Sequence, residues 1–411
     1  MTLLRGDLVK RWSWMGILAS ILCLLLIGVS GYQAYQTRNV PAPLASSIEL
    51  YAFDHGNLVG YSARDGSVRW KHPLEDSYTG RLSLEAEGNI IYVSGQTSAV
   101  NVVAAYRADT GTLLWRTPLA PFTSGLLNDQ PPPVADGMVF VSLSGHGYPF
   151  NGLLYALHGN SGQIAWKHQV PPYPLSVFKA PLAGGSGLIV ALTKDHGIFA
   201  WHTLDGSLAW HSSLGGYQAV CAQQACYFLQ DTFIAPGTAQ AREHFTALAL
   251  RTSDGKLLWQ RDIPLQGNAS GANNVLAVFG QHVYVGVVAH WLDVLSTLDG
   301  ALLWHREVGL PLGETPLEAN GVVYAPTGLS IEALNAHDGT LLWNRDADPD
   351  SLFDTPLFIR NVLFVAESPA PLPERIPHGE GSSTLFALHA GDGSVYWHLP
   401  GRGPLAITDT A

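Results

Sequence analysis

The chain has 411 residues, of which 47% are hydrophobic and only 13% charged, and it contains 43 glycines and 26 prolines. This composition suits an all-β protein with many tight turns and argues against a helical bundle. The formal net charge is −11, and the first 40 residues hold four basic residues and one acidic residue, so the remainder carries −14. An acidic body repels nucleic acid and anionic lipid, which excludes both as expected ligands of the folded part.

The first predicted element is an apolar stretch over residues 12–31. Its length matches the ~20 residues that a membrane-spanning helix needs. Arg5, Lys10 and Arg11 precede the stretch, and positive charge on that side predicts a cytoplasmic N-terminus over residues 1–11. We therefore expect one transmembrane signal anchor in the cell membrane, with everything downstream on the extracytoplasmic side.

Residues 32–47 are polar and contain proline, so they are expected to form a tether between the anchor and the folded part. The alternative is a signal peptide that is cleaved after the small residues before Tyr32. In that case the mature protein would be secreted rather than anchored.

From residue 48 onward the sequence repeats. Eight segments, such as ADTGTLLW and TLDGALLW, share a glycine four residues before a tryptophan, and successive tryptophans lie 39 to 54 residues apart. This is the period of a four-stranded propeller blade, a WD-like repeat architecture. An Asp-Gly or Ser-Gly pair supplies the positive φ of a tight hairpin turn. The eight pairs are Gly66/Trp70, Gly111/Trp115, Gly162/Trp166, Gly206/Trp210, Gly255/Trp259, Gly300/Trp304, Gly339/Trp343 and Gly393/Trp397.

A small side chain lies six residues before each motif glycine. It is alanine in six repeats, and Gly60 and Val294 are the two variants. A small residue beside a regularly placed tryptophan predicts that the indole packs into the gap, blade against blade. Burial removes ~150–250 Å² of each tryptophan from water, so we interpret these residues as core and not as cofactor-stacking groups.

The C-terminal segment is expected to complete the first blade. That blade begins near Ile48 without an innermost strand of its own, and a Pro-Leu pair at Pro404 resembles the starts of inner strands elsewhere. Residues 403–409 would then close the ring and hide two sheet edges. The predicted fold is an all-β, eight-bladed β-propeller of four-stranded antiparallel blades over residues 48–411. The matching inner-strand starts are Pro133, Pro181, Pro316 and Pro356.

The motif resembles the tryptophan-docking repeat of the PQQ-like propeller superfamily, Ala-x-Asp-x-x-Thr-Gly-x-x-x-Trp, over residues 48–411. This superfamily includes the quinoprotein alcohol dehydrogenases and the outer-membrane assembly lipoprotein BamB, so the resemblance implies a fold and leaves the function open. The chain departs from the pattern at the aspartate position. That position holds Ser62, Arg107, His158, His202, Arg251, Ser296, Asn335 and His389.

The resemblance makes a PQQ-dependent dehydrogenase the alternative function. Enzymes of that family use an adjacent Cys-Cys disulfide, Ca²⁺-bound PQQ, a catalytic aspartate and a longer chain, and this sequence has no adjacent cysteine pair. Asp346, Asp348 and Asp350 open like a calcium loop, but Ser351 replaces the glycine and Leu357 the bidentate glutamate. We therefore expect no enzymatic activity, no PQQ or Ca²⁺ cofactor and no metal site.

Cys221 and Cys226 flank Gln223 and Gln224, where other blades turn from their first strand to their second. If the two glutamines form the turn, the cysteines become a non-hydrogen-bonded pair with Cα atoms ~4.5 Å apart, within reach of a disulfide. An oxidising compartment favours the disulfide. Two reduced, buried thiols are the alternative.

We letter the strands of a blade A to D from the innermost outward. The A–B and C–D turns share one face and are short, while the B–C and D–A loops share the other face and carry the insertions 117–132, 144–151, 231–244 and 367–383. Variable loops on a rigid scaffold are where function concentrates. We predict a non-catalytic protein-binding or scaffold module that meets a cell-envelope protein through this face. The candidate partner-binding aromatics, which could equally cover their own blades, are Phe122, Tyr148, Phe150 and Phe233.

Overall fold

The computed structural model describes residues 48–54, 56–75, 77–121, 126–127, 131–144, 152–170, 174–180, 187–193, 197–234, 242–264, 274–287, 291–308, 314–327, 329–349, 351–369, 383–400 and 406–409. Within these ranges the chain forms strands and turns and no helix. Consequently no helix in the described ranges could span a membrane. The expected anchor over residues 12–31 and the tether over residues 32–47 lie outside the described residues.

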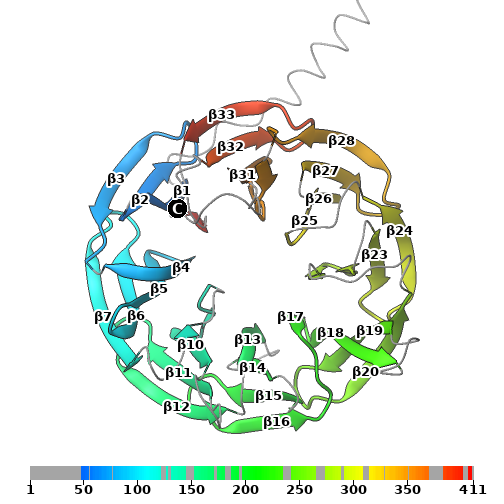
Figure 1. The fold of residues 1–411 in the computed structure, drawn as a ribbon, viewed down its shortest axis with the longest axis horizontal. Helices are drawn as coiled ribbons and strands as arrows, with labels where there is room; N and C mark the ends of the chain where they lie inside the picture. The colour runs from blue at the N-terminus through cyan, green and yellow to red at the C-terminus, as the bar shows by residue number, and fades with distance from the viewer. Residues whose placement is uncertain are drawn as a thin grey trace, which may run out of the picture. The chain divides into compact units, whose positions relative to one another are not determined.

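The described strands form eight sheets arranged as blades around a common centre (Figure 1). This confirms the predicted eight-bladed propeller of four-stranded antiparallel blades. Blade 1 consists of β34 (Ala406–Asp409), β1 (Ile48–Asp54), β2 (Asn57–Ser62) and β3 (Val68–Pro73). Blade 2 consists of β4 (Tyr78–Glu87), β5 (Ile90–Thr97), β6 (Val100–Arg107) and β7 (Leu113–Pro121). Blade 3 consists of β8 (Leu126–Leu127), β9 (Val134–Ala135), β10 (Met138–Ser144), β11 (Gly152–His158) and β12 (Ile164–Val170).

The middle blades follow the same order from the centre outward. Blade 4 consists of β13 (Pro174–Ala180), β14 (Leu188–Thr193), β15 (Gly197–His202) and β16 (Leu208–Ser212). Blade 5 consists of β17 (Gln218–Ala222), β18 (Ala225–Ile234), β19 (Arg242–Arg251) and β20 (Leu257–Ile263). Blade 6 consists of β21 (Val275–Phe279), β22 (His282–Gly286), β23 (Trp291–Ser296) and β24 (Leu302–Glu307).

Blades 7 and 8 complete the ring. Blade 7 consists of β25 (Leu317–Ala319), β26 (Val322–Pro326), β27 (Ser330–Asn335) and β28 (Leu341–Asp346). Blade 8 consists of β29 (Ser351–Phe353), β30 (Leu357–Ile359), β31 (Val362–Pro369), β32 (Thr384–His389) and β33 (Val395–Pro400). In blades 3 and 8 two short segments share the inner A position, so strand A is interrupted there.

Blade 1 joins the two ends of the propeller sequence. β34 pairs antiparallel with β1, from the pair Ile48 and Asp409 to the pair Tyr51 and Ala406. Trp397 of blade 8 also donates from its indole Nε1 to the carbonyl O of Ala63 in blade 1, 3.3 Å away. Strand pairing and side-chain docking therefore both close the ring, which covers the edges that an open array would expose.

Three of the Pro-Leu or Pro-Val pairs directly precede an inner strand. Pro133 precedes β9, Pro316 precedes β25 and Pro356 precedes β30. The expectation is wrong for Pro181, because β13 ends at Ala180 and the inner strand of blade 4 thus comes before the proline. Pro404 lies outside the described residues.

A row of three side chains crosses strands B, C and D of each blade. In blade 7 the row is Tyr324, Ala333 and Trp343, which pair in register. The small middle residue lets the two rings approach, with centroids 5.9 Å apart. Seven blades have such an aromatic–tryptophan pair at 5.8 to 6.4 Å, and blade 4 has Val190 at the B position instead.

The position of this row corrects the expected packing of the motif tryptophans. We expected the gap beside the small residue to receive the indole of a neighbouring blade, but in every blade the small residue lies opposite the tryptophan of its own blade. The observed pairs are Trp70 with Gly60, Trp115 with Ala105, Trp166 with Ala156, Trp210 with Ala200, Trp259 with Ala249, Trp304 with Val294, Trp343 with Ala333 and Trp397 with Ala387. The cause is the antiparallel register, which brings strands C and D into direct cross-strand pairing at this point. The small residue therefore packs within a blade, and another residue must make room between blades.

A β-bulge interrupts the C–D pairing of every blade, one residue before the tryptophan. In blade 6, Trp304 pairs with Val294 and Leu302 with Leu295, which leaves Leu303 as the extra residue. A bulge turns the extra side chain away from the ladder. Leu303 is accordingly 49% exposed.

Candidate functional site

Each motif tryptophan binds the next blade through one hydrogen bond. Trp304 of blade 6 donates from its indole Nε1 to the carbonyl O of Ala336 in blade 7, 2.9 Å away. All eight tryptophans make the same bond to the residue three positions before the next motif glycine, at 2.7 to 3.3 Å. Trp70 thus bonds to Ala108, Trp210 to Thr252 and Trp259 to Thr297. Because this bond repeats at every blade junction, the tryptophans are structural docking residues.

Burial of the motif tryptophans is less uniform than a core interpretation predicts. Four of them are only 7% to 9% exposed, namely Trp115, Trp210, Trp259 and Trp304. The other four, Trp70, Trp166, Trp343 and Trp397, are half-buried, and the first three of them pack against buried core clusters. All eight tryptophans lie on strand D, the outermost strand of a blade, and dock on the next blade.

The motif glycine is the residue that makes room between blades. All eight have φ between 68° and 72°, a region that disfavours side chains. A Cβ at Gly339 would also lie 2.6 Å from Cε3 of Trp304, which belongs to the preceding blade. The glycine therefore serves both the C–D turn and the inter-blade contact.

The position that departs from the superfamily pattern contributes the same backbone hydrogen bond to every C–D turn, while its side chain differs from blade to blade, for example Ser296 Oγ, which accepts from the N of Leu298 at 3.2 Å. At all eight turns the motif glycine N donates to the carbonyl O of this residue, four positions earlier. Arg107 and His158 hold this position in blades 2 and 3, and both are exposed. The turn therefore forms without the aspartate, since the bond that shapes it comes from the main chain.

The histidines that follow the tryptophans divide into two groups. Those one residue after the tryptophan, such as His305, are exposed, as expected for a solvated outer strand. His168, two residues after Trp166, is half-buried, lies 2.6 Å from the carbonyl O of Gly206 through Nε2, and stacks on Trp201. The strand alternation turns the position of His168 towards the next blade.

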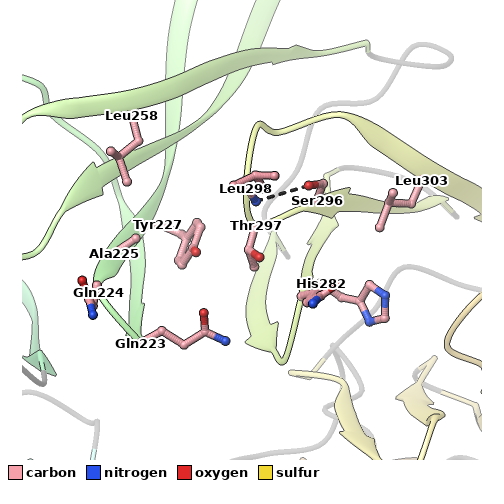
Figure 2. Close-up of a pocket in the computed structure, with 11 residues that line it drawn as sticks. Gln223, Gln224, Ala225, Tyr227, Leu258, His282, Ser296, Thr297, Leu298 and Leu303 are labelled. Atoms are coloured by element: carbon pink, nitrogen blue, oxygen red, sulfur yellow. Dashed lines mark hydrogen bonds between the residues drawn. The ribbon is translucent and has the colours of Figure 1, made fainter. Parts of the chain in front are cut away.

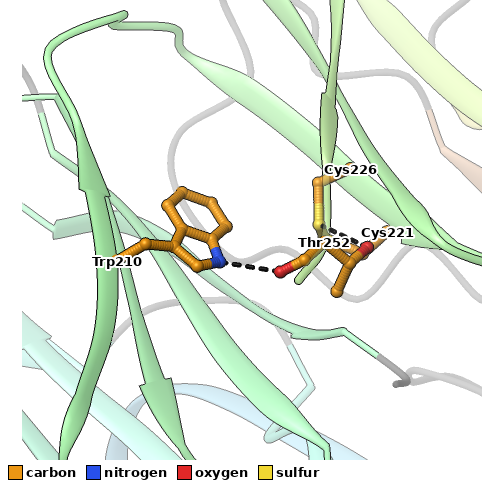
Figure 3. Close-up of a disulfide and its surroundings, with 4 residues drawn as sticks. All are labelled: Trp210, Cys221, Cys226 and Thr252. Carbon is orange, nitrogen blue, oxygen red and sulfur yellow. Dashed lines mark hydrogen bonds between the residues drawn. A yellow bond between two sulfur atoms is a disulfide. The ribbon is translucent and has the colours of Figure 1, made fainter. Parts of the chain in front are cut away.

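A disulfide joins Cys221 and Cys226 in blade 5 (Figure 3). The two cysteines pair directly across β17 and β18, with Cα atoms 4.0 Å apart, and Gln223 and Gln224 form the turn between the strands. Cys226 is fully buried, and its Sγ lies 3.9 Å from Oγ1 of Thr252. The bond thus fastens the innermost hairpin of the blade near the turn face.

Blade 8 contains a buried carboxyl group at the break in its inner strand. Burial raises the pKa of Asp354 to about 6. Ser368 donates from Oγ to Oδ2 of Asp354 at 3.0 Å, and the nearby Glu314 accepts a hydrogen bond from Thr355. The side chains here are two carboxyl groups and two hydroxyls, and the raised pKa is that of Asp354.

A pocket with a volume of about 620 Å³ lies on the turn face, between blades 5 and 6 (Figure 2). Its polar wall comes from the A–B turns of both blades and includes Gln223, Gln224 and His282. Its apolar wall comes from Leu258 and Leu303 on the outer strands, with Leu298 at the tip of a C–D turn. Sequence reasoning missed this site because its residues are far apart in the chain.

The candidate partner-binding aromatics remain untested. Phe122, Tyr148 and Phe150 lie outside the described residues. Phe233 is part of β18, where it pairs with Glu243, and its side chain is not among those described. The structure therefore does not bring these four residues together into a described site.

The described residues do not gather the ligands expected for a Ca²⁺-bound PQQ. In the described part of the chain no three His, Cys, Asp or Glu side chains gather as metal ligands, and Asp346 and Asp348 are both exposed. The disulfide joins residues five positions apart, whereas the quinoprotein family uses adjacent cysteines. We therefore derive no reaction step through this cofactor.

Comparison with known proteins identifies the family from the sequence. The family model for outer membrane protein assembly factor BamB matches residues 54–233, 99–275 and 246–405. BamB of Moranella endobia is 26% identical over 329 residues, which cover 76% of this chain and 78% of the relative.

Two solved structures show how widely the fold is shared. BamB from Moraxella catarrhalis has a TM-score of 0.54 at 17% identity, over 82% of this chain and 95% of that one. Quinohemoprotein alcohol dehydrogenase from Comamonas testosteroni has a TM-score of 0.55 at 14% identity, over 88% of this chain and 72% of that one. Identities this low establish the fold alone, whereas the family model spans nearly the whole propeller. The chain therefore belongs to the family of the outer membrane protein assembly factor BamB.

Proposed function

We propose that this chain is a non-catalytic, protein-binding β-propeller of the cell envelope that takes part in outer membrane protein assembly. The observation that carries the proposal is the match of the BamB family model over residues 54–405, in three overlapping segments. The relatives that share this model are named as assembly factors. A protein with such a role needs a rigid body that presents binding loops, and a closed ring of eight blades supplies one.

The proposed binding surface is the face formed by the B–C and D–A loops. Antiparallel order places the short C–D turns, which are occupied by inter-blade docking, on the opposite face. The longer loops of the sequence include 144–151 in blade 3 and 367–383 in blade 8. Phe122, Tyr148, Phe150 and Phe233 are the proposed anchors, since aromatic side chains contribute strongly at protein interfaces.

We also propose that residues 12–31 hold the propeller on the extracytoplasmic side of the membrane as a single-pass anchor. The support is the apolar length and the preceding basic residues, together with relatives whose name refers to outer membrane assembly. The partner in this proposal is a protein of the same envelope.

Site-specific photo-crosslinking tests the loop face. A photoreactive residue replaces Phe122, Tyr148, Phe150 or Phe233, one at a time, and matched variants carry it at the exposed turn-face positions Ile164 and Leu204. We expect discrete protein adducts in isolated envelopes from loop positions and none at the same mass from the two controls. Adducts from neither set, or from the controls alone, would overturn the assignment of the loop face.

The dehydrogenase alternative predicts a different result. Titration of the purified full chain with PQQ and Ca²⁺, followed by absorbance of the quinone, would show saturable binding in a quinoprotein. We expect no saturable change, because the chain lacks the adjacent cysteine pair of that family. Stoichiometric binding, followed by reduction of the quinone with an alcohol, would favour the enzyme and contradict the proposed role.

A further inference from the structure

The pocket between blades 5 and 6 lies on the turn face, opposite the proposed loop face. Three leucines form its outer wall and rim, with Leu258 42%, Leu303 49% and Leu298 86% exposed. Leu258 and Leu303 are the bulge residues of their blades and lie unpaired on the outer strands. Figure 2 shows them on the side of the pocket away from the glutamines. An apolar side chain that enters between them would remove leucine surface from water.

The inner wall offers hydrogen bonds. Gln223 donates from Nε2 to the carbonyl O of Gly280, which fixes its side chain across the blade junction, and Gln224 and Gln281 also line the pocket. His282 reaches Glu318 of blade 7 through Nδ1 at 2.9 Å, so its ring is held in place. Amide and imidazole groups of this kind can bond to the main chain of an extended peptide.

The electrostatics of the rim favour a positive charge. Asp299 directly follows Leu298 at the turn tip, and it accepts a hydrogen bond from the backbone N of Ala301 at 3.1 Å. That bond and the hydroxyl of Ser296 lower the pKa of Asp299, so the carboxylate stays charged at neutral pH. The pocket lining contains no lysine or arginine. Arg261 of β20 also acts on Asp299 through its charge, so a basic side chain beside the apolar one would share this carboxylate with one cation outside the lining.

Blade 4 has the same turn sequence and shows what creates the pocket. Residues 203–206 and 297–300 both read Thr-Leu-Asp-Gly. At the junction of blades 3 and 4, Asp136 bridges the two blades by accepting hydrogen bonds from Oγ1 of Thr203, at 2.5 Å, and from the N of Gly187, at 2.7 Å. Gln223 holds the corresponding turn position in blade 5, but it bonds to Gly280 and leaves Thr297 facing the pocket.

We propose that this pocket is a second docking site, which binds a short extended segment of a partner protein carrying an apolar side chain next to a lysine or arginine. The apolar residue lies between Leu258, Leu298 and Leu303. The basic residue pairs with Asp299, and the main chain bonds to the glutamines. Because this site and the loop face are on opposite sides, the propeller can hold two proteins at once.

Binding of synthetic peptides to the full-length chain in a mild non-ionic detergent tests this site. The probe is a short labelled peptide with Lys-Leu-Lys at its centre, compared with Glu-Leu-Glu and Lys-Gly-Lys versions by fluorescence anisotropy. We expect the Lys-Leu-Lys peptide to bind most tightly. Leu298→Ala should weaken it about tenfold, equivalent to about 1.4 kcal/mol. Asp299→Asn keeps the turn acceptor and should weaken binding about threefold, an effect that added salt removes.

Blade 4 supplies the matched controls. Leu204 is 53% exposed and Asp205 accepts the backbone N of Ser207 at 2.9 Å, as Asp299 accepts that of Ala301. Leu204→Ala and Asp205→Asn should leave the peptide affinity unchanged. Equal binding of all three peptides, or equal losses in blades 4 and 6, would overturn the proposal. Self-association of the parent chain that Leu298→Ala abolishes in sedimentation would assign the pocket to a second copy and also overturn it.

Discussion

Each motif glycine meets two separate requirements at the scale of a single residue. One is the left-handed backbone of the C–D turn, and the other is close approach of a tryptophan ring from the preceding blade. The two requirements can be separated by comparison with Gly321, which lies in an A–B turn. Gly321 has φ of 76°, but a Cβ at this position would have no other atom within 4 Å. Gly339 has a similar φ of 72° and lies against Trp304.

We expect Gly339→Ala to destabilise the propeller more than Gly321→Ala. The backbone cost is shared and amounts to about 1–2 kcal/mol for an L-residue in this region. Only Gly339→Ala adds overpacking against the indole, which costs a further ~1–3 kcal/mol. Urea denaturation of the two variants measures the difference. Equal losses would show that the ring yields and that the glycine is needed for the turn alone.

The buried carboxyl group of Asp354 predicts a pH-dependent variant. Burial raises its pKa to about 6, above the ~3.9 of an unfolded chain, so the folded state binds more protons between these values. Stability contributed by the protonated form is therefore full below about pH 4 and is lost as pH rises through about 6. Glu314 nearby adds to the cost of ionisation.

Asp354→Asn should consequently stabilise the chain by about 2 kcal/mol near pH 7, because the neutral amide removes the ionisation cost and can still accept from Ser368. The gain should shrink to nothing near pH 4. Urea denaturation at both values checks this, with Asp346→Asn at an exposed position as the control. A gain of the same size at both pH values would show that charge is not its cause.

At the scale of single residues, the sequence identified the motif glycines and tryptophans more easily than the groups that they contact. Gly339 and Trp304 stand out by spacing, since the period is visible along the chain. That Trp304 reaches the carbonyl of Ala336 depends on how one blade lies on the next, which spacing does not encode. Asp354 gave no sequence signal, because its burial results from the break between β29 and β30.

At the scale of elements, local turn chemistry was the strongest guide to the strands. An Asp-Gly or similar pair fixes a hairpin whatever lies around it, so strands C and D could be placed in every blade. Inner strands were harder, because a proline can end a strand as well as begin one. Pro356 precedes β30, whereas Pro181 follows β13. The bulges were also unforeseen, since a single extra residue leaves the Gly-to-Trp spacing unchanged.

The closing strand gives the prediction at this scale. Deletion of residues 402–411 removes β34, which pairs with β1 at four positions from Ile48 to Tyr51. Leu50 and Tyr51 are fully buried, so loss of cover and of strand hydrogen bonds should lower stability severely. Several buried side chains at ~1.5–3 kcal/mol each approach the ~5–15 kcal/mol margin of a whole domain.

Thermal melting with light scattering measures this effect, and a deletion of equal length in the tether, residues 33–42, is the control. The C-terminal deletion should aggregate or melt far below the parent, whereas the tether deletion should melt with it, because the tether completes no blade. A C-terminal deletion that melts beside the parent would mean that Trp397 docking on Ala63 closes the ring without β34.

At the scale of the whole molecule, the two faces of the propeller differ in the segments that they carry. One face carries the described A–B and C–D turns, where Asp205 and Asp299 each follow an exposed leucine. The other carries the long loops, whose aromatics are the proposed partner-binding residues. A ring closed by repeated docking keeps the two faces at a fixed separation, which suits a protein that must hold one partner while engaging another. Their partners could not be predicted, because repeats encode the scaffold and not what it binds.

Attachment to the membrane also concerns the molecule as a whole. Residues 12–31 are long enough to remain in a bilayer, and Arg5, Lys10 and Arg11 should keep the N-terminus in the cytoplasm. We expect the intact mass of the mature protein to include this segment, and the protein to stay with membranes after an alkaline carbonate wash.

Replacing the three basic residues with glutamate should reduce the fraction of propeller that is accessible to protease from outside the cytoplasmic membrane, because the orientation signal is lost. Replacing each arginine with lysine and the lysine with arginine at the same three positions keeps the positive charge and should leave that fraction unchanged. A mature N-terminus at Tyr32 with the propeller free in the wash would replace the anchor by a cleaved signal peptide, while the eight-bladed fold and its two faces would stand as before.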